Sequence, residues 1–160
     1  MNRFDRRAFL GFAGSGVMIA AVAAVKPSRA ATPAVSHTAA EWRRMLGSER
    51  YAVLREAATE RPYSSPLLKE HRRGTFTCAG CALPLFSSTT KFESGTGWPS
   101  FWQPLPGAVA KRADYKLGYE RDEVRCRRCD GHLGHVFDDG PKPTGLRYCM
   151  NGLALNFRPA

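Results

Sequence analysis

The five cysteines of this 160-residue chain fall into two Cys-x-x-Cys pairs and one single residue. The pairs are Cys78 with Cys81 and Cys126 with Cys129, and Cys149 stands alone. A Cys-x-x-Cys turn presents two sulfur atoms to one metal ion, and two such turns complete the tetrahedral shell that zinc prefers. Because the pairs are far apart in the sequence, one ion would join two separate hairpins. The spacing therefore predicts a structural zinc site.

Two alternatives to zinc stay open at this level, namely two disulfides or a four-sulfur iron site. A shell closed by four sulfurs leaves no open coordination position, so we expect no catalysis at the metal itself. Cys149 is the one thiol that such a site would not use. A lone cysteine is commonly a buried and inert side chain, and the alternative is that it serves as a nucleophile.

The first thirty residues have the pattern of an export signal. Arg6 and Arg7 precede an apolar stretch, 11–25, that glycine dilutes. The paired arginines favour the twin-arginine route over ordinary secretion. We expect residues 1–30 to be a signal peptide that is cleaved after Ala30 and directs the protein to the periplasm; the alternative is retention as a membrane anchor. A protein exported in its folded state would carry metal-bound thiolates that are already protected from oxidation.

The remaining chain is sufficient for one ordinary core, because 43% of the residues are hydrophobic. We expect a flexible linker over 31–37 and one domain over 38–160. The formal net charge is +10, but lysine and arginine are scattered among acidic residues with no interleaved aromatic side chains. That pattern is typical of a solvated surface and not of a nucleic-acid site. We expect a monomer that meets a membrane only through an uncleaved leader.

Local signals predict a short helical segment at the start of this domain. Thr38 and Glu41 form a capping-box pattern, and the helix that follows should end at Gly47. Trp42, Met45 and Leu46 fall on one face of that helix, and a second short helix should begin at Ser48 and place Tyr51, Val53 and Leu54 on one side.

Short apolar runs separated by glycine and proline follow the helical segment, and each is typical of a brief antiparallel strand. The runs cover 74–77, 83–86, 115–119, 123–125, 135–137, 146–148 and 153–157. The fold class expected from these patterns is mainly β, with a short helical N-terminal segment packed on sheets of short strands.

Two further segments carry candidate functional side chains. His132 and His135 lie in a glycine-rich stretch, where both could face one pocket, lower the pKa of a nearby thiol and donate a proton. Trp98 lies in a loop that glycines and a proline constrain, and an exposed indole there could receive a small apolar group such as a methyl. The alternatives are structural hydrogen bonding or metal ligation for the histidines and core packing for the tryptophan.

Three motifs together resemble the B-type peptide methionine-R-sulfoxide reductases. They are Gly-Trp-Pro-Ser-Phe at 97–101, His-Leu-Gly-His-Val-Phe at 132–137 and Arg-Tyr-Cys-Met-Asn at 147–151. The match extends from about Glu41 to Phe157 and includes the turn at 59–62 and both cysteine pairs.

The resemblance implies two antiparallel sheets, a structural zinc ion held by the two cysteine pairs, and catalysis by Cys149. It also implies that His135, with His132, binds and protonates the sulfoxide oxygen. By the same similarity Asn151 helps to orient the site, and Trp98 and Phe137 bind the substrate. The implied reaction leaves a sulfenic acid on the cysteine. The implied substrates are oxidised proteins and peptides, so the expected role is repair of exported proteins under oxidative stress.

Two positions depart from the family pattern. Thr96 stands where many members carry a second cysteine, and Gly152 stands where serine is common. Every other cysteine is assigned to zinc, so we expect an external thiol or a thioredoxin-like donor to regenerate the enzyme. Two other functions remain as alternatives, a thiol redox sensor and a non-catalytic zinc-binding module.

Overall fold

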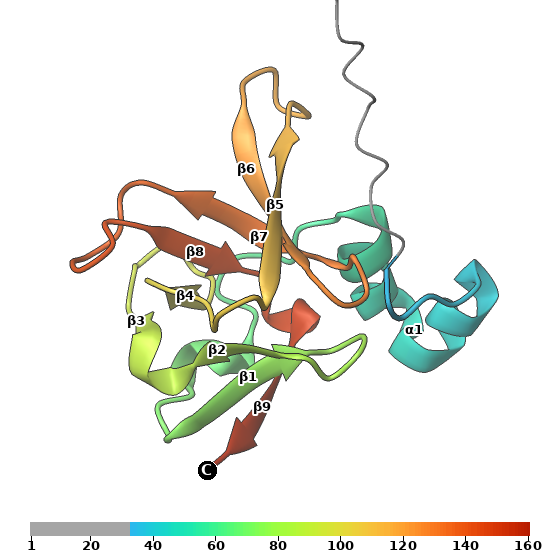
Figure 1. The fold of residues 1–160 in the computed structure, drawn as a ribbon, viewed down its shortest axis with the longest axis horizontal. Coiled ribbons are helices and arrows are strands. Elements are labelled where there is room, and N and C mark those ends of the chain that lie inside the picture. Colours follow the sequence, from blue (N-terminus) through green and yellow to red (C-terminus); the bar gives the residue numbers. More distant parts are fainter. Residues whose placement is uncertain (1–32) are drawn as a thin grey trace, which may run out of the picture. The chain divides into compact units, whose positions relative to one another are not determined.

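The structure, a computed structural model, describes residues 33–160, which form a helix broken at Gly47 and two antiparallel sheets (Figure 1). The expected signal peptide, 1–30, lies outside those residues. Within 33–160, no helix is both long and apolar enough to cross a membrane. In the segment expected to be a linker, the Val35 amide donates to the Arg128 carbonyl at 3.0 Å, and the His37 ring packs edge-on against Trp42.

Helix α1 (Ala39–Glu56) begins at the predicted capping box, in which the Thr38 hydroxyl and the Glu41 carboxylate each bond the other residue's amide. Gly47 interrupts the helix with φ 71° and ψ 172°, a conformation that a residue with a side chain adopts only under strain. The predicted break between two short helices is therefore confirmed. Met45 is 54% exposed, unlike the buried Trp42, because it lies at the edge of the apolar stripe.

The smaller sheet has three strands in the order β2-β1-β9. Its strands are β1 (Gly74–Cys78), β2 (Pro84–Ser87) and β9 (Leu155–Pro159). The larger sheet has six strands in the order β3-β4-β8-β7-β6-β5. Its strands are β3 (Lys91–Phe92), β4 (Ser100–Phe101), β5 (Val109–Asp114), β6 (Arg121–Cys126), β7 (His132–Phe137) and β8 (Arg147–Met150). Short 3-10 turns cover Pro66–Lys69, Ser88–Thr90 and Gly152–Ala154. The predicted fold class is confirmed.

The prediction of a strand over 115–119 is wrong, because those residues form the turn between β5 and β6. The strand itself, β5, lies just before them and has few apolar residues. It is the edge strand of the larger sheet, so much of its surface is exposed and its sequence needs no apolar alternation. In Figure 1 the β5–β6 hairpin extends beyond the neighbouring strands.

An aromatic cluster joins the two sheets. Phe76 and Phe86 belong to the smaller sheet, and Phe101 and Tyr148 belong to the larger one. The rings of Phe86 and Phe101 stack at 4.4 Å, and Phe76 meets Phe101 edge-on at 4.9 Å. Successive side chains on a strand point to opposite faces, so the neighbour of Tyr148, Cys149, is directed away from this core.

Candidate active site

One face of the larger sheet collects polar and reactive side chains. Cys149 on β8 pairs with Ser100 on β4 at one side and with His135 on β7 at the other. His135 in turn pairs with Glu123 on β6. Residues directly opposite each other in antiparallel strands point to the same face, so these four form a row across the sheet. The strand register therefore brings Cys149 and His135 together.

A β-bulge in β7 brings the second histidine to this face. Val124 pairs with Gly134, whereas Arg125 pairs with His132, so Leu133 is the extra residue. Without that extra residue, His132 would point to the face opposite His135. The two imidazole rings are 5.5 Å apart.

A cavity of about 130 Å³ opens above Cys149. Most of the predicted site residues that do not belong to the expected zinc site line this cavity. Its lining is Thr59, Trp98, Arg121, Gly134, His135, Phe137, Cys149 and Asn151. His132 does not line this cavity; it lines a neighbouring one. The structure thus places five of the six predicted residues around one small space, with the sixth beside it.

The thiol of Cys149 is half-buried, and its surroundings act on its pKa in opposite directions. Burial raises the pKa above its ordinary value. Thr96, whose Oγ1 lies 3.8 Å from the Cys149 sulfur, and the Arg147 guanidinium lower it, but burial outweighs them. The thiolate is therefore a minor species until a nearby group stabilises it.

His135 is held by a carboxylate on the β5–β6 hairpin. Its Nε2 donates to Asp114 Oδ2 at 2.8 Å. Burial lowers the pKa of His135, and the bond to Asp114 opposes that shift. Asp114 also accepts from Arg121 at 2.5 Å and from the Lys116 amide at 3.0 Å. The Lys116 amide and His135 lower the pKa of Asp114 to about 2, so its carboxylate is ionised and Nε2 carries the proton.

His132 is only 2% exposed, and its Nδ1 lies 2.7 Å from Glu123 Oε1. Burial raises the pKa of Glu123, but the bonds from His132 and Arg125 outweigh burial and leave that pKa lowered. Among the described residues, no group bonds the buried Nε2 of His132. His132 is therefore held by Glu123 next to His135, and it lies outside the lining of the Cys149 cavity.

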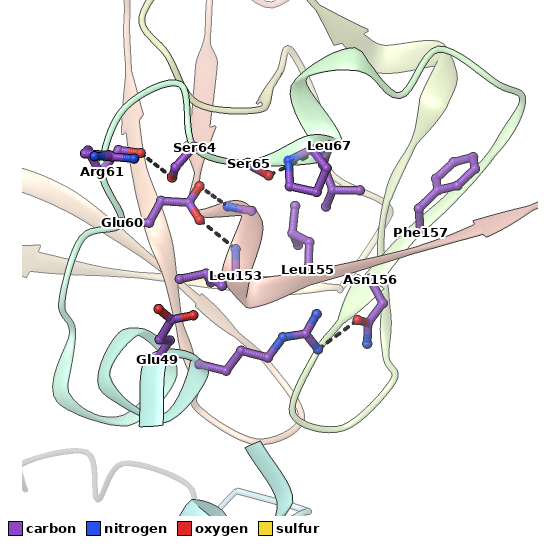
Figure 2. A pocket seen from close by; sticks show the side chains of 13 residues that line it. Glu49, Glu60, Arg61, Ser64, Ser65, Leu67, Leu153, Leu155, Asn156 and Phe157 are labelled. Carbon is purple, nitrogen blue, oxygen red and sulfur yellow. Dashed lines mark hydrogen bonds between the residues drawn. The ribbon is translucent and has the colours of Figure 1, made fainter. Parts of the chain in front are cut away.

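Asn151 and Trp98 are tied to one turn after α1. The Glu60 amide donates to Asn151 Oδ1 at 2.9 Å, and the Trp98 indole donates to the Glu60 carbonyl at 3.1 Å. The Glu60 carboxylate accepts from the amides of Gly152 and Leu153, as Figure 2 shows. Asn151 also donates to the Leu133 carbonyl at 3.1 Å. Asn151 thus orients the segment after Cys149, and both the oxygen and the nitrogen of its side-chain amide form hydrogen bonds.

Sequence reasoning missed several side chains that organise this face. Arg147 forms a two-bond ion pair with Asp139 at 2.7 and 2.8 Å and stacks over the Phe137 ring at 4.5 Å. Asp114 and Glu60 were missed in the same way. Charged residues are common on surfaces, and none of these has a spacing that marks its role. Arg147 and Glu60 nevertheless lie in segments that the family resemblance includes, 147–151 and 59–62, and the pairing of β7 with β8 sets Phe137 opposite Arg147.

The four remaining cysteines form a separate cluster in which all sulfur atoms lie within 4.8 Å of one another. The sulfurs of Cys78 and Cys129 are 3.7 Å apart, and those of Cys81 and Cys126 are 3.5 Å apart. A tetrahedron with zinc–sulfur bonds of about 2.3 Å has edges of about 3.8 Å. A disulfide would need about 2.05 Å. The cluster therefore fits a tetrahedral metal ion such as zinc.

Backbone contacts support this cluster. Arg55 donates to the Cys129 carbonyl at 2.9 Å, and Arg128 donates to the Cys81 carbonyl at 3.2 Å. Arg125, the residue before Cys126, does not contact these carbonyls and forms ion pairs with Glu123 and Asp130.

The family model of the SelR domain matches residues 46–159. Three similar proteins carry the name peptide methionine sulfoxide reductase MsrB. The one from Agrobacterium fabrum is 50% identical over 129 residues, which are 80% of this chain and 96% of the relative. The one from Bradyrhizobium diazoefficiens is 56% identical over 120 residues, 74% of this chain and 86% of the relative. The one from Leptospira interrogans is 51% identical over 119 residues, 74% and 91% of the two chains. With its sheets, its cysteine cluster and this similarity, the chain belongs to the SelR-domain family of MsrB peptide methionine sulfoxide reductases and is an oxidoreductase.

Proposed function

We propose that this protein reduces the R epimer of peptide-bound methionine sulfoxide through Cys149. One observation carries the proposal: a cysteine outside the metal cluster lines a small cavity together with an imidazole and two aromatic rings. The names of the relatives support a peptide-bound sulfoxide as substrate. The preference for the R epimer rests on the resemblance of the three motifs.

The chemistry transfers one oxygen atom from the substrate to the enzyme. The Cys149 thiolate attacks the sulfoxide sulfur, and His135 donates a proton to the sulfoxide oxygen. The attack forms a sulfur–sulfur bond. That bond and the substrate's sulfur–oxygen bond then both break as the protonated oxygen passes to the Cys149 sulfur, so methionine leaves and Cys149 holds the oxygen as a sulfenic acid. The substrate gains two electrons and Cys149 loses two. Trp98 and Phe137 provide apolar walls for the methyl group of the substrate. Ser100 and His135 pair with Cys149 on either side and hold it in the sheet.

Regeneration of Cys149 requires an external thiol. A first thiol condenses with the sulfenic acid and releases water, and a second thiol, or the second thiol of a thioredoxin-like donor, reduces the resulting mixed disulfide. Thr96 lies against the Cys149 sulfur, and a hydroxyl group cannot form a disulfide. No other cysteine among residues 33–160 lines this cavity. These observations support regeneration without an internal disulfide.

We extend the proposal to the cellular role. The twin-arginine pattern in residues 1–30 supports export to the periplasm, where the clients would be oxidised exported proteins. We propose that the domain acts there as a monomer with one structural zinc ion. The test measures periplasmic activity after fractionation of cells that express the full chain. Cells that express a variant with Arg6 and Arg7 both replaced by Lys provide the comparison. Periplasmic activity that survives this replacement would contradict twin-arginine export.

The decisive assay uses separate R and S epimers of a methionine sulfoxide peptide with excess dithiothreitol. We expect many turnovers of the R epimer only, and none after Cys149→Ser. The zinc content and melting temperature of that variant should match those of the wild type, which separates lost chemistry from lost folding. Oxidation of Cys149 without repeated turnover would instead indicate a redox sensor and would overturn the proposal.

Mass spectrometry tests the route of regeneration. Zinc-loaded enzyme treated with substrate but no reductant should hold one added oxygen on Cys149. Thr96→Cys provides the positive control, because it places a thiol against the Cys149 sulfur and should yield an internal disulfide. An internal Cys149 disulfide in the wild type would overturn regeneration by an external thiol alone.

A further inference from the structure

The cavity above Cys149 is too small for a whole peptide. Its volume is about 130 Å³, whereas pockets that enclose a drug-sized ligand measure roughly 300–1,000 Å³. It has room for the end of a methionine sulfoxide side chain. The backbone and the flanking residues of a substrate must therefore lie outside it.

Three larger cavities share lining residues with it, and two of them also border the β5–β6 hairpin. One, of about 520 Å³, shares Thr59, Arg121 and His135. The other, of about 490 Å³, shares Arg121 and Phe137. Arg121 thus lines both of these spaces and the Cys149 cavity, and it lies at the start of β6 next to the β5–β6 turn. A substrate chain that leaves the Cys149 cavity through either of these two spaces therefore meets this hairpin.

The tip of the hairpin is unusually apolar for an exposed turn. Tyr115 is 61% exposed, Leu117 60% and Tyr119 58%. Tyr115 and Leu117 line the first of the larger cavities, and Tyr119 lines the second. Five large hydrophobic side chains are exposed among residues 33–160, and three of them lie on this one turn. Such clustering at one place marks an interaction site more often than scattered exposure does.

We propose that this apolar tip, Tyr115, Leu117 and Tyr119, docks a locally unfolded polypeptide that carries methionine sulfoxide next to apolar residues. The inference rests on the proposed function and names its preferred substrate. Methionine is among the residue types most often buried in folded proteins, so its sequence neighbours are frequently apolar. When oxidation and unfolding expose such a segment, its apolar side chains can lie along the hairpin while the sulfoxide enters the Cys149 cavity. Arg121, which lines the Cys149 cavity and the two cavities that border the hairpin, places the hairpin beside the Cys149 cavity and supports this path.

The test compares two peptides with the sulfoxide at their centre, one flanked by leucine and phenylalanine and one flanked by glycine and serine. The wild type should show the lower KM for the apolar peptide. The triple variant Tyr115→Ser, Leu117→Ser, Tyr119→Ser should raise that KM about tenfold, because each lost contact costs binding energy. Its kcat for both peptides, and its KM for the glycine and serine peptide, should remain within about twofold, since the hairpin tip touches no reacting atom.

Met45→Ser is the matched control, because Met45 is also exposed but lies on α1 and lines none of the three cavities. It should leave the KM for both peptides unchanged. Leu117→Ser alone should give a smaller rise in KM for the apolar peptide, which keeps the test valid if the triple variant folds poorly. A wild type that reduces neither peptide would refute the proposed function. A wild type that reduces both, with hairpin variants that keep its KM or weaken both peptides equally, would overturn this inference alone.

Discussion

At the scale of single residues, the pKa values of His135 and Cys149 set the pH dependence of the proposed reaction. Burial lowers the first and raises the second. The reactive form, imidazolium with thiolate, is therefore a minor tautomer of the singly protonated pair. That pair dominates between the two pKa values. We expect kcat/KM to be flat over this range, to fall below the pKa of His135 and to fall above that of Cys149.

Asp114→Asn should widen this plateau and lower it. The Asp114 carboxylate favours the imidazolium form of His135, so its removal lowers the pKa of His135 further. Each unit of that decrease moves the acid limb down by one pH unit and lowers the plateau about tenfold, because the imidazolium tautomer becomes rarer. Profiles of kcat/KM against pH would measure both effects.

Glu56→Gln is the control for this prediction, because Glu56 forms an exposed ion pair with Arg43 on α1, away from the cavity. It should leave the profile unchanged. If Asp114→Asn reduced activity with the acid limb unmoved, Asp114 would have only a structural role.

Gly152 and Ser65 form a second coupled pair of residues. A Cβ atom at position 152 would overlap the Ser65 hydroxyl and lie 2.5 Å from Ser65 Cβ. The Ser65 side chain therefore occupies the space that a serine side chain at position 152 would need, so glycine fits there. Gly152→Ser should destabilise the domain by about 1–3 kcal/mol through overpacking.

Adding Ser65→Gly should recover most of that loss. Ser65 also caps the following 3-10 turn through the Leu67 amide, but replacing a capping serine by glycine costs only a few tenths of a kcal/mol. Urea unfolding of the two single variants and the double variant gives the coupling free energy. Simple additivity of the two substitutions would show that the residues do not compete for space.

At the scale of secondary-structure elements, the sequence best predicts the features that are set by residues close together along the chain. The start of α1 and its break at Gly47 follow from a capping box and a glycine, both of which are local signals. The motif residues Cys149, His135, Trp98, Phe137 and Asn151 could likewise be named from the sequence, and they line one cavity.

Features that depend on distant partners could not be predicted in this way. Edge strand β5 has no apolar alternation, so the exposed aromatic residues after it gave the stronger and misleading signal for a strand. The bulge at Leu133, which turns His132 toward the face of His135, exists only in relation to β6. Asp114 on β5 can reach His135 on β7 because both strands pair with β6. The sequence therefore indicated the candidate reacting groups but not the elements that orient them.

At the scale of the whole domain, the cysteine cluster connects the two sheets. Cys78 ends β1, and Cys81 lies in the turn before β2, both in the smaller sheet. Cys126 ends β6, and Cys129 lies in the turn before β7, which carries His135. An ion held by all four would fix the smaller sheet to strands β6 and β7 of the larger sheet. We therefore expect the metal to maintain the fold and to affect catalysis only through it.

Loss of the metal should unfold the domain broadly. Structural zinc sites contribute about 10–16 kcal/mol of apparent binding free energy, whereas whole domains are stable by about 5–15 kcal/mol. Cys126→Ser, or a strong chelator applied to the wild type, should therefore remove most cooperative unfolding seen by calorimetry and abolish activity at the same time. Metal analysis of the wild type should find one zinc per chain. Cys149→Ser, a cysteine replacement outside the cluster, should keep its zinc and its melting temperature. A Cys126→Ser protein that stayed folded and stable but inactive would assign the metal a direct chemical role, which a shell of four sulfurs with no open position does not allow.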